Sequence, residues 1–352
     1  MSEAKGMGIY MKKKNDFAWY LSLFLSKYLP GQRNVSTNTI ASYRDTFKLF
    51  LLFCDDTKGL KPEKVTLNSV TRETITEFLE WIEKKRKCSI ATRNQRLSAI
   101  HAFFRYVQKE SPDNLFEIHK ILKIPLKKKP KPLVSYLSAD ELKILFKQPD
   151  MNSKEGRRDL VLLVLMYDTA ARVSELIDLR IRDIRLSSPS VVTLHGKGDR
   201  SRQVPIIGKT KNHLAVYLEE HKKYDWGIAT ADTPVFFNQQ HKKLSRWGVS
   251  YILNKYVEMA KGYTGFTVNF PITPHVLRHS KAMGLLQAGI NLIYIRDFLG
   301  HSSVVTTEIY ARADSEMKRK AIESVYMDLS PLEMPKWEEN EDLMYWLQNL
   351  CK

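Results

Sequence analysis

Four separated stretches of the sequence carry side chains that could do chemistry on a phosphate group. Their reactive residues are, in chain order, Arg172, Lys197, His275 with Arg278, and His301 with Tyr310. Any one of them alone is weak evidence, because a single arginine, histidine or tyrosine is more often a surface or structural residue. Together they supply groups that could bind an anion, move a proton and attack phosphorus.

The two arginines and the tyrosine suit the cleavage of a phosphodiester. In its transition state, negative charge spreads over two non-bridging oxygens while one oxygen attacks and another leaves. Arg172 and Arg278 can clamp the charged oxygens with paired hydrogen bonds, and Lys197 on a glycine-flanked tip can give a proton to the leaving oxygen. The hydroxyl of Tyr310 can attack, although its ordinary pKa of about 10 requires a cation or a base beside it. Such a site needs no metal ion.

A zinc site is the alternative for the two histidines near residue 275. His275 and His279 are four positions apart and would share one face of a helix, as zinc ligands do. However, Val276 stands where the HExxH pattern needs glutamate, and Arg278 between the histidines would repel a cation. No nearby cysteine or carboxylate pair completes a ligand set, so the sequence predicts no metal and no other cofactor.

The order and spacing of these residues resemble the tyrosine recombinase (phage integrase) family, and within it the Xer-like simple recombinases. The resemblance rests on Leu-Arg-His-Ser around Arg278 and on Leu-Gly-His-Ser-Ser followed by Tyr-Ala-Arg, in which Tyr310 follows His301 by nine residues. It extends over nearly the whole chain. One departure is Ala170, which stands where the family commonly has glycine before the first arginine.

The resemblance implies a role for each polar residue around the phosphate. Arg172 and Arg278 would bind the scissile phosphate, and Lys197 would be the general acid toward the departing 5′ hydroxyl. His275 would assist proton transfer, and His301 would donate a hydrogen bond to a phosphate oxygen.

The resemblance also implies the reaction and its partners. Tyr310 would be the nucleophile that forms a 3′-phosphotyrosyl bond, and Glu175 would support the site. Because the covalent link keeps the phosphodiester energy, rejoining would need neither ATP nor metal. The family acts as a homotetramer on two double-stranded DNA sites and exchanges strands through a Holliday junction.

Helical periodicity dominates the first part of the chain, which predicts a small bundle. Four amphipathic helices are expected, over residues 16–29, from Ser36, from Thr71 and from Ser89, the first ending at Pro30 and Gly31. By the resemblance, residues 1–122 are a SAM-like core-binding domain that clamps DNA. Residues 123–133, rich in lysine and proline, are expected to be an extended basic linker.

The second part is predicted to be mainly helical with a small antiparallel sheet. Ser138 and Glu141 form a capping box, and residues 191–195 and 202–207 flank a glycine-rich tip, as in a β-hairpin. Residues 134–330 are expected to be the mixed α/β catalytic domain. Residues 331–352 are expected to form an acidic amphipathic helix that docks on a neighbouring subunit or folds back on its own domain.

The composition predicts a binding partner and a cellular compartment. The formal net charge of +17 favours binding to a polyanion, nucleic acid first. Candidate DNA contacts are Arg93, Arg96, Arg105, Lys127, Lys128, Lys129 and Lys243. The cysteines, three and far apart, exclude a disulfide scaffold, and no apolar run approaches the roughly 20 residues of a membrane span. A cytoplasmic, nucleoid-associated protein without membrane contact is expected.

Two other functions use much the same residues. A type IB topoisomerase relaxes supercoils as a monomer with a similar tyrosine and arginines; the compact bundle and the acidic tail favour recombination over it. A non-catalytic DNA-binding protein of the same fold is disfavoured because every catalytic residue type is present. Chromosome dimer resolution and the integration, excision or inversion of mobile elements remain open.

Overall fold

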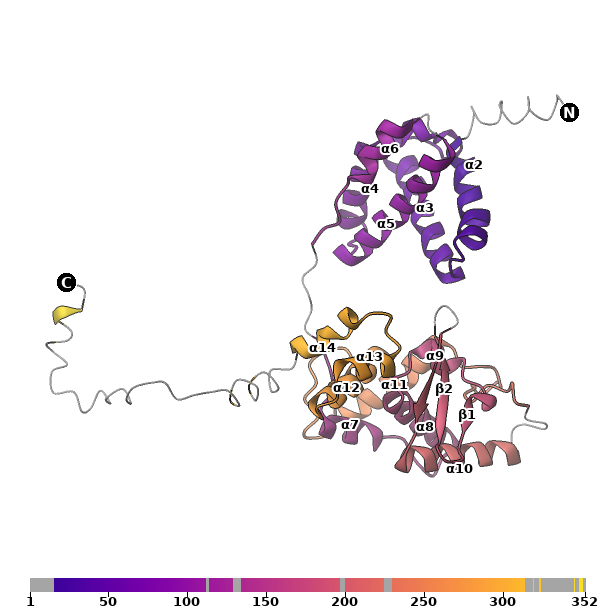
Figure 1. Cartoon of the computed structure of the whole chain (residues 1–352), viewed down its shortest axis with the longest axis vertical. Coiled ribbons are helices and arrows are strands. Elements are labelled where there is room, and N and C mark those ends of the chain that lie inside the picture. Colours follow the sequence, from indigo (N-terminus) through magenta and orange to yellow (C-terminus); the bar gives the residue numbers. More distant parts are fainter. Residues whose placement is uncertain are drawn as a thin grey trace. The chain divides into compact units, whose positions relative to one another are not determined.

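The computed structural model describes residues 16–111, 114–128, 134–196, 200–224 and 230–313, with a few residues beyond. The chain divides into two compact units, Met1–Lys131 and Pro132–Lys352 (Figure 1). Lys129, Lys197 and most of the expected acidic helix 331–352 lie outside the described residues.

The first unit is entirely helical in its described part. Its helices are α2 (Asp16–Leu23) continuing as the π-helix η1 (Phe24–Gln32), α3 (Thr37–Lys58), α4 (Arg72–Lys84), α5 (Ile90–Glu110) and α6 (Leu115–Leu122), with short 3₁₀ turns η2 (Pro62–Lys64) and η3 (Leu67–Ser69). The hydroxyls of Thr71 and Ser89 cap α4 and α5 by accepting from backbone N–H groups one turn on. The predicted starts of both helices are therefore confirmed.

Two features of this unit differ from the sequence-based expectation. The first helix does not end before Pro30 but continues to Gln32, because its last turns widen to the i→i−5 pattern seen in the bond from Arg33 N to Tyr28 O. A proline has no N–H to donate, and the wider turn tolerates it. A further short helix, α6, packs its Ile118 and Ile121 into the core.

The second unit combines helices with one three-stranded sheet. Its helices are α7 (Ala139–Phe146), α8 (Lys154–Asp168), α9 (Val173–Ile177), α10 (Gly208–Tyr224), α11 (Arg246–Ala260), α12 (Pro274–Gln287), α13 (Leu292–Leu299) and α14 (Glu308–Ala313), with 3₁₀ turns η5 (Ile181–Asp183) and η6 (Val304–Thr306). The strands β1 (Ile184–Arg185), β2 (Val191–His195) and β3 (Ser201–Pro205) pair antiparallel in sequence order. The predicted hairpin and the capping box at Ser138 are confirmed.

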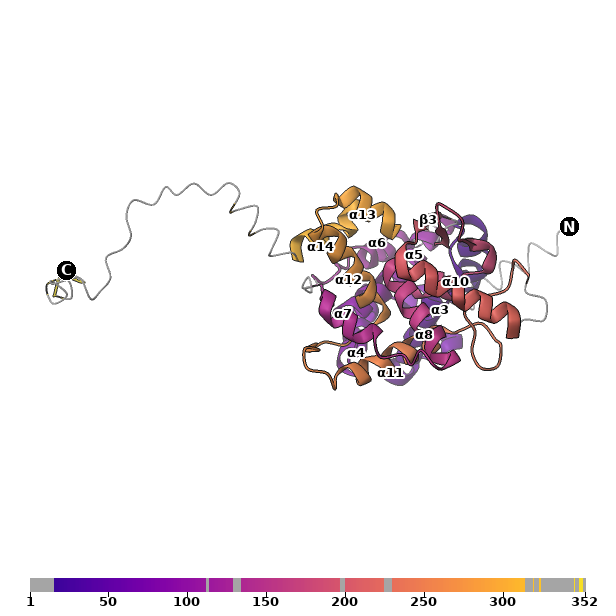
Figure 2. The same cartoon turned by 90° about the horizontal axis from the view of Figure 1, so that it is seen from below.

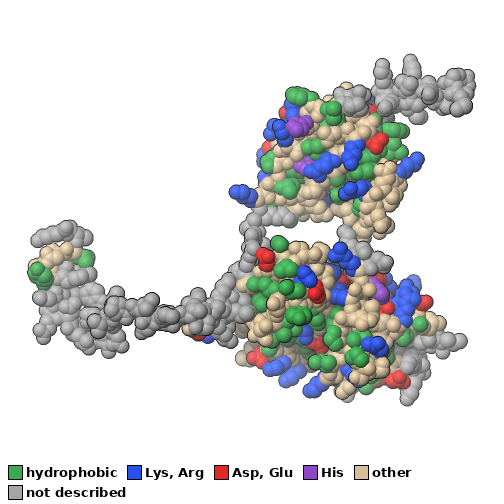
Figure 3. All heavy atoms as spheres, in the orientation of Figure 1, with side chains coloured by type: hydrophobic (Ala, Val, Ile, Leu, Met, Phe, Trp, Pro, Cys, Tyr) green, Lys and Arg blue, Asp and Glu red, His purple; other side chains and the backbone are tan. Residues whose placement is uncertain are grey.

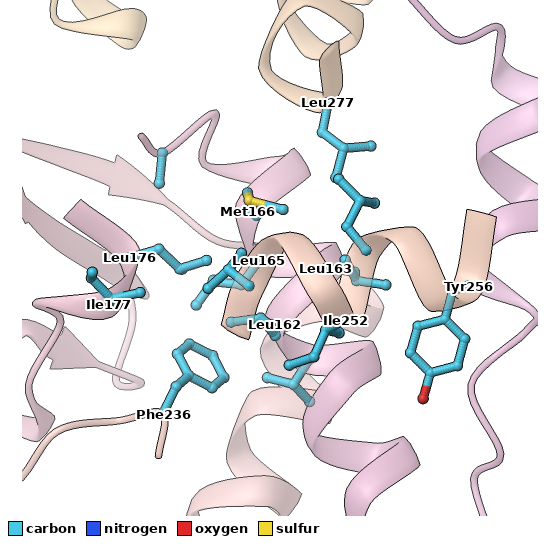
Figure 4. Packing of buried hydrophobic residues seen from close by; sticks show 14 of the residues in the cluster. Leu162, Leu163, Leu165, Met166, Leu176, Ile177, Phe236, Ile252, Tyr256 and Leu277 are labelled. Carbon is cyan, nitrogen blue, oxygen red and sulfur yellow. The ribbon is translucent and has the colours of Figure 1, made fainter. Parts of the chain in front are cut away.

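The core of this unit surrounds α8, which is apolar on nearly every side and is therefore buried. Leu162, Leu163, Leu165 and Met166 of α8 pack against α9, α11 and α12, as Figure 4 shows with Leu277 of α12. Because α9 and α12 are fixed on this rigid core, the residues at their N-termini are held in place.

A smaller apolar cluster forms where α12 packs against α13 and α14 (Figure 2). Its buried members are Ala170, Ala282, Met283, Leu286, Ile295, Leu299 and Tyr310. The cluster places the end of α13 and the start of α14 beside α12.

In the part of the chain that the structure describes, no helix has the length and apolar character needed to cross a bilayer.

Candidate active site

Arg172 is placed by a sharp turn between α8 and α9. Ala170 in this turn has φ of +46°, a left-handed conformation that costs a residue with a side chain about 1–2 kcal/mol. This explains why glycine is common there in the family that the sequence resembles. After the turn, Arg172 is the N-cap of α9, and its side chain is about one-third exposed.

Glu175 is the anionic centre of the site. It is 3% exposed, and its Oε1 lies 2.7 Å from Nη1 of Arg172, while its Oε2 accepts from the backbone N–H of the same residue. Arg202 of β3 donates to both carboxylate oxygens, at 3.0 and 2.9 Å. Burial alone would raise the pKa of Glu175, but the bonds and charges of Arg202 and Arg172 outweigh it and lower that pKa. The carboxylate is thus ionised and held by two guanidiniums.

Arg202 connects three elements, and sequence reasoning missed it. Besides holding Glu175, its Nε donates to the carbonyl of Phe298 in α13, at 2.9 Å. Its side chain is 12% exposed. One signal could have revealed it: Arg202 is two residues from buried Val204 on β3, and residues two apart on a strand point to the same face.

The tip of the hairpin begins beside these charges. A Cβ at Gly196 would lie 3.4 Å from Oε1 of Glu175 and 4.0 Å from Nη1 of Arg172, so the chain here passes close to the site. His195 at the end of β2 bonds to buried Asp183, at 3.0 Å. Lys197, the residue after Gly196, lies outside the described residues, and its role as an acid stays a prediction.

Arg278 is buried in the first turns of α12. It is 3% exposed and donates to the carbonyls of Ala170 and Leu299, both at 2.6 Å. Burial, followed by the charges of Arg172 and Arg202, lowers its pKa to about 10, so the guanidinium remains charged at neutral pH. Its two bonds tie α12 to the turn before α9 and to the end of α13.

The two predicted histidines flank these arginines. His275, three residues before Arg278, remains exposed, yet packing around its ring and the charges of Arg278 and Arg172 lower its pKa. His301 follows α13 and bonds through Nδ1 to the buried hydroxyl of Thr307, at 3.1 Å. Burial and then the nearby arginines lower the pKa of His301 to about 4. At neutral pH it is uncharged and can donate through one ring nitrogen only.

Tyr310 lies on α14 and is 1% exposed. Its hydroxyl lies 2.9 Å from Nδ1 of His279, a residue that the sequence offered only as a zinc ligand. Burial raises the pKa of Tyr310, against the opposing charges of Arg278 and Arg172. Burial, then His275 and Arg278, lowers the pKa of His279 to about 4. The pair is therefore a protonated phenol and a neutral imidazole.

The structure thus brings most of the predicted residues to one region of the second unit. Hydrogen bonds link the start of α9, the sheet, α12 and the end of α13 around Arg172, Glu175 and Arg278; Arg172 also reaches the carbonyl of Gly300, at 3.3 Å. The positive charges of Arg278 and Arg172 are close enough to act on the pKa of both His301 and Tyr310, each in the downward direction. Such a site presents fixed cations, neutral proton carriers and a phenol, as anionic phosphate chemistry requires.

Two of the candidate DNA contacts, both on α5, donate hydrogen bonds to oxygens inside the first unit. Arg93 is buried and donates to the carbonyl of Pro125, at 3.2 Å. Arg96 donates to the hydroxyl of Thr46, at 3.0 Å, and so joins α5 to α3. Their contact with DNA stays a prediction.

The remaining candidates are closer to the surface. Lys127 pairs with Glu83 at 2.7 Å, Lys243 of the second unit pairs with Asp178, and Arg105 and Lys128 are exposed. Phosphate contacts by these residues also stay predictions. Within the described ranges, no group of three or more His, Cys, Asp or Glu side chains could hold a metal ion.

Comparison with known families identifies the class. The phage integrase family matches residues 135–317, and the SAM-like N-terminal domain of phage integrases matches residues 23–111. The chain therefore belongs to the phage integrase family, the tyrosine recombinases, and is an enzyme of DNA cleavage and religation.

Curated relatives agree over most of their length. A putative integrase/recombinase, y4rC, of Sinorhizobium fredii is 35% identical over 89% of this chain and 92% of its own. The tyrosine recombinase XerC of Bacillus pumilus is 32% identical over 84% of this chain and 92% of its own.

Solved structures share the fold at lower identity. The XerH site-specific recombinase bound to palindromic difH substrate, in a post-cleavage complex, has a TM-score of 0.64 at 24% identity, covering 82% of this chain and 80% of that one. A lambda integrase dimer bound to a core site has a TM-score of 0.60 at 19% identity, covering 90% and 99%.

Proposed function

We propose that this protein is a site-specific recombinase that cuts one strand of double-stranded DNA through a 3′-phosphotyrosyl bond at Tyr310. The observation that most directly supports this is the pair of arginines at the joined ends of α9, α12 and α13, with Tyr310 and two histidines next to them. Arg172 and Arg278 bind the non-bridging oxygens of the scissile phosphate, and Glu175 holds Arg172 in place.

The chemical step balances without a metal ion or ATP. The phenolic oxygen of Tyr310 bonds to phosphorus, the bond to the 5′ oxygen breaks, and Lys197 gives that oxygen its proton. His275 accepts or passes on the phenolic proton, and neutral His301 donates to a phosphate oxygen. Attack by a 5′ hydroxyl of the partner strand reverses each step and frees Tyr310.

For complete recombination we propose a homotetramer on two DNA sites, which exchanges strands through a Holliday junction. We propose two alternative cellular roles. One is chromosome dimer resolution by a recombinase similar to the tyrosine recombinase XerC. The other is integration or excision of a mobile element, since the integrase of transposon Tn1549, solved with circular intermediate DNA, shares the fold. For either role we propose that the protein acts in the cytoplasm, on the nucleoid. The acidic segment 331–352 is proposed to dock on a neighbouring subunit.

The substitution Tyr310→Phe tests the central assignment. We expect it to abolish the covalent protein–DNA adduct on a nicked target duplex in denaturing gels, because the nucleophilic oxygen is gone. DNA affinity should stay within about twofold, since Tyr310 is buried in the free protein. Tyr294→Phe, on the neighbouring helix α13 and 72% exposed, is the matched control and should form adducts normally.

An adduct that persists in Tyr310→Phe would contradict the proposal. Complete relaxation of supercoiled plasmid lacking any recombination site would support a type IB topoisomerase instead. Both assays use the full chain, so the result does not depend on either unit folding alone.

A further inference from the structure

The hydroxyl of Tyr310 is neither free nor exposed in this structure. The ring packs in the apolar cluster between α12, α13 and α14, with Met283 and Leu299 among its members. Its polar atom is satisfied by His279, at 2.9 Å between the phenolic oxygen and Nδ1. The ring centroids of this pair are 5.6 Å apart, and the ring planes are inclined to each other by 58°.

His279 occupies a separate position from the groups that bind phosphate. It directly follows Arg278 on α12, and neighbouring residues on a helix point about 100° apart. Arg278 uses its two Nη atoms on the carbonyls of Ala170 and Leu299, whereas His279 faces α14. One turn of α12 therefore holds the anion-binding group and the partner of the phenol side by side.

We propose that His279 is a positioning residue for the nucleophile: its Nδ1 accepts the hydrogen bond of the Tyr310 hydroxyl and restrains the phenol in a buried resting position that DNA binding must release. The proposal rests on the proposed function of Tyr310. It adds a residue that had no expected part in the reaction.

The protonation states decide between a restraint and a general base. Burial lowers the pKa of His279 to about 4 and raises the pKa of Tyr310 from its ordinary value. Transfer of the phenolic proton to His279 is therefore unfavourable, because burial opposes the charged form of both groups. A neutral imidazole with one nitrogen free to accept is, by contrast, well suited to hold a protonated phenol.

The loss of this acceptor would act on a buried hydroxyl. Without its acceptor the buried hydroxyl loses the net stabilisation of one hydrogen bond, so the phenol would favour solvent. The change predicts an increase of about three- to tenfold in the exposed population. DNA that offers the phenol a phosphate would act in the same direction.

Nitration of the free protein with tetranitromethane, followed by tryptic peptide mapping, measures this population. The peptide of residues 297–312 contains Tyr310 as its single tyrosine, the peptide of residues 282–296 contains exposed Tyr294, and the peptide of residues 256–261 contains buried Tyr256. Tyr294 calibrates the reagent, and Tyr256, which is 2% exposed, reports general unfolding.

Two substitutions separate the acceptor from the bulk of the side chain. His279→Leu removes the acceptor and keeps an apolar side chain of similar size, so nitration of Tyr310 should rise about three- to tenfold while Tyr256 stays protected. His279→Asn retains an amide oxygen close to the position of Nδ1 and should restore protection to within about twofold. At saturating target DNA, adduct formation by the Leu variant should also rise by about the same factor.

Unchanged nitration of Tyr310 in His279→Leu, with Tyr294 modified as usual, would overturn the restraint. So would slower adduct formation by the Leu variant. Failure of the proposed function would be a different result. Adducts that persist in Tyr310→Phe would show that Tyr310 is not the nucleophile, whereas the nitration comparison in the free protein would still test the contact between His279 and Tyr310.

Discussion

At the scale of single residues, the site is a problem of charge balance. Three guanidiniums, of Arg172, Arg202 and Arg278, gather around Glu175, the one buried carboxylate that bonds to any of them among the residues that the structure describes. Their mutual repulsion contributes to the lowered pKa of Arg278. A carboxylate that accepts from two of them compensates part of this repulsion. The uncompensated positive charge is what a DNA phosphate would meet.

Replacement of Arg202 tests this balance. Arg202→Met should lower the free energy of unfolding by about 3 kcal/mol, because it leaves the buried Glu175 with one cationic partner fewer. It should also slow adduct formation, because Arg202 bonds both to Glu175, which holds Arg172, and to the carbonyl of Phe298 in α13. Denaturant titration and single-turnover cleavage measure the two effects.

The control for Arg202 is an exposed pair on the same unit. Arg180→Met breaks a bond to Asp232 whose partners are each about half exposed, so the loss should be below about 1 kcal/mol. Equal losses in the two variants would contradict the special role of Arg202.

The depressed histidines predict a pH dependence. His279 and His301 have pKa values of about 4 in the folded chain and about 6.5 when unfolded. The unfolded chain therefore takes up these protons first, so the contribution of the two histidines to stability is complete above pH 6.5 and is lost as the pH falls toward 4. Each histidine contributes at most about 3 kcal/mol, and less because both are partly exposed.

Urea titrations at pH 7, 6 and 5 check this slope, since Glu175 titrates below that range. His301→Asn should make the slope shallower without abolishing it, because the pKa values of His279, His275 and His101 are lowered as well. His241→Asn, at an exposed loop position, is the matched control. The same slope in wild type and His301→Asn would refute the assignment.

The sequence was sufficient to find residues that form a recognisable set by type and spacing. It was not sufficient to find residues whose role depends on a contact with a distant residue in the fold. Arg172, Arg278 and Tyr310 could be chosen because their order and spacing match a family. Arg202 acts through Glu175 and Phe298, and His279 acts through Tyr310, 31 positions away. Periodicity carries no information on such distant pairs, so only the fold could reveal them.

At the scale of elements, the C-terminal end of α13 is where several parts of the site are in contact. Gly300 has φ of +64° at the C-cap of α13, and its carbonyl accepts from Arg172. A Cβ at this position would lie 3.0 Å from Nη1 of Arg202. The helix end is thus shaped both by backbone conformation and by the arginine beside it.

Gly300→Ala and Gly289→Ala separate these two effects. Gly289, after α12, has φ of +81°, and a Cβ there would meet nothing within 4 Å, so its substitution reports backbone strain of about 1–2 kcal/mol. Gly300→Ala should cost that amount and also displace Arg202, slowing adduct formation about tenfold or more while Gly289→Ala leaves it nearly unchanged. Equal cleavage rates in the two variants would show that Arg202 does not depend on Gly300.

Elements were predictable where local signals were complete. Hydroxyl caps at Thr71, Ser89 and Ser138 marked helix starts, and the glycine-rich tip marked the hairpin. The continuation of the first helix through Pro30 was not predictable, because a π-turn depends on packing rather than on a local residue pattern.

At the scale of the whole molecule, the net charge of +17 is the property that concerns DNA most. Lys and Arg side chains are spread over the face of each unit seen in Figure 3, with Asp and Glu among them. Many of the basic groups are paired within the protein, as Lys127 is with Glu83 and Lys243 with Asp178. The net charge alone therefore does not give the number of phosphates contacted.

The salt dependence of binding counts these contacts directly. Each neutralised phosphate lowers log affinity by about 0.9 per log unit of salt, so a clamp of five or more contacts predicts a slope steeper than about −4. Fluorescence anisotropy of the full chain on a labelled duplex between about 0.1 and 0.3 M salt measures it. Arg105→Gln, at an exposed candidate position, should make the slope about 0.9 shallower if it touches a phosphate, whereas Arg44→Gln, whose guanidinium is bound to Asp45, is the paired comparison. A slope near zero for the wild type would mean that its excess of basic residues is not directed at a nucleic-acid backbone, and would remove the physical basis for the clamp.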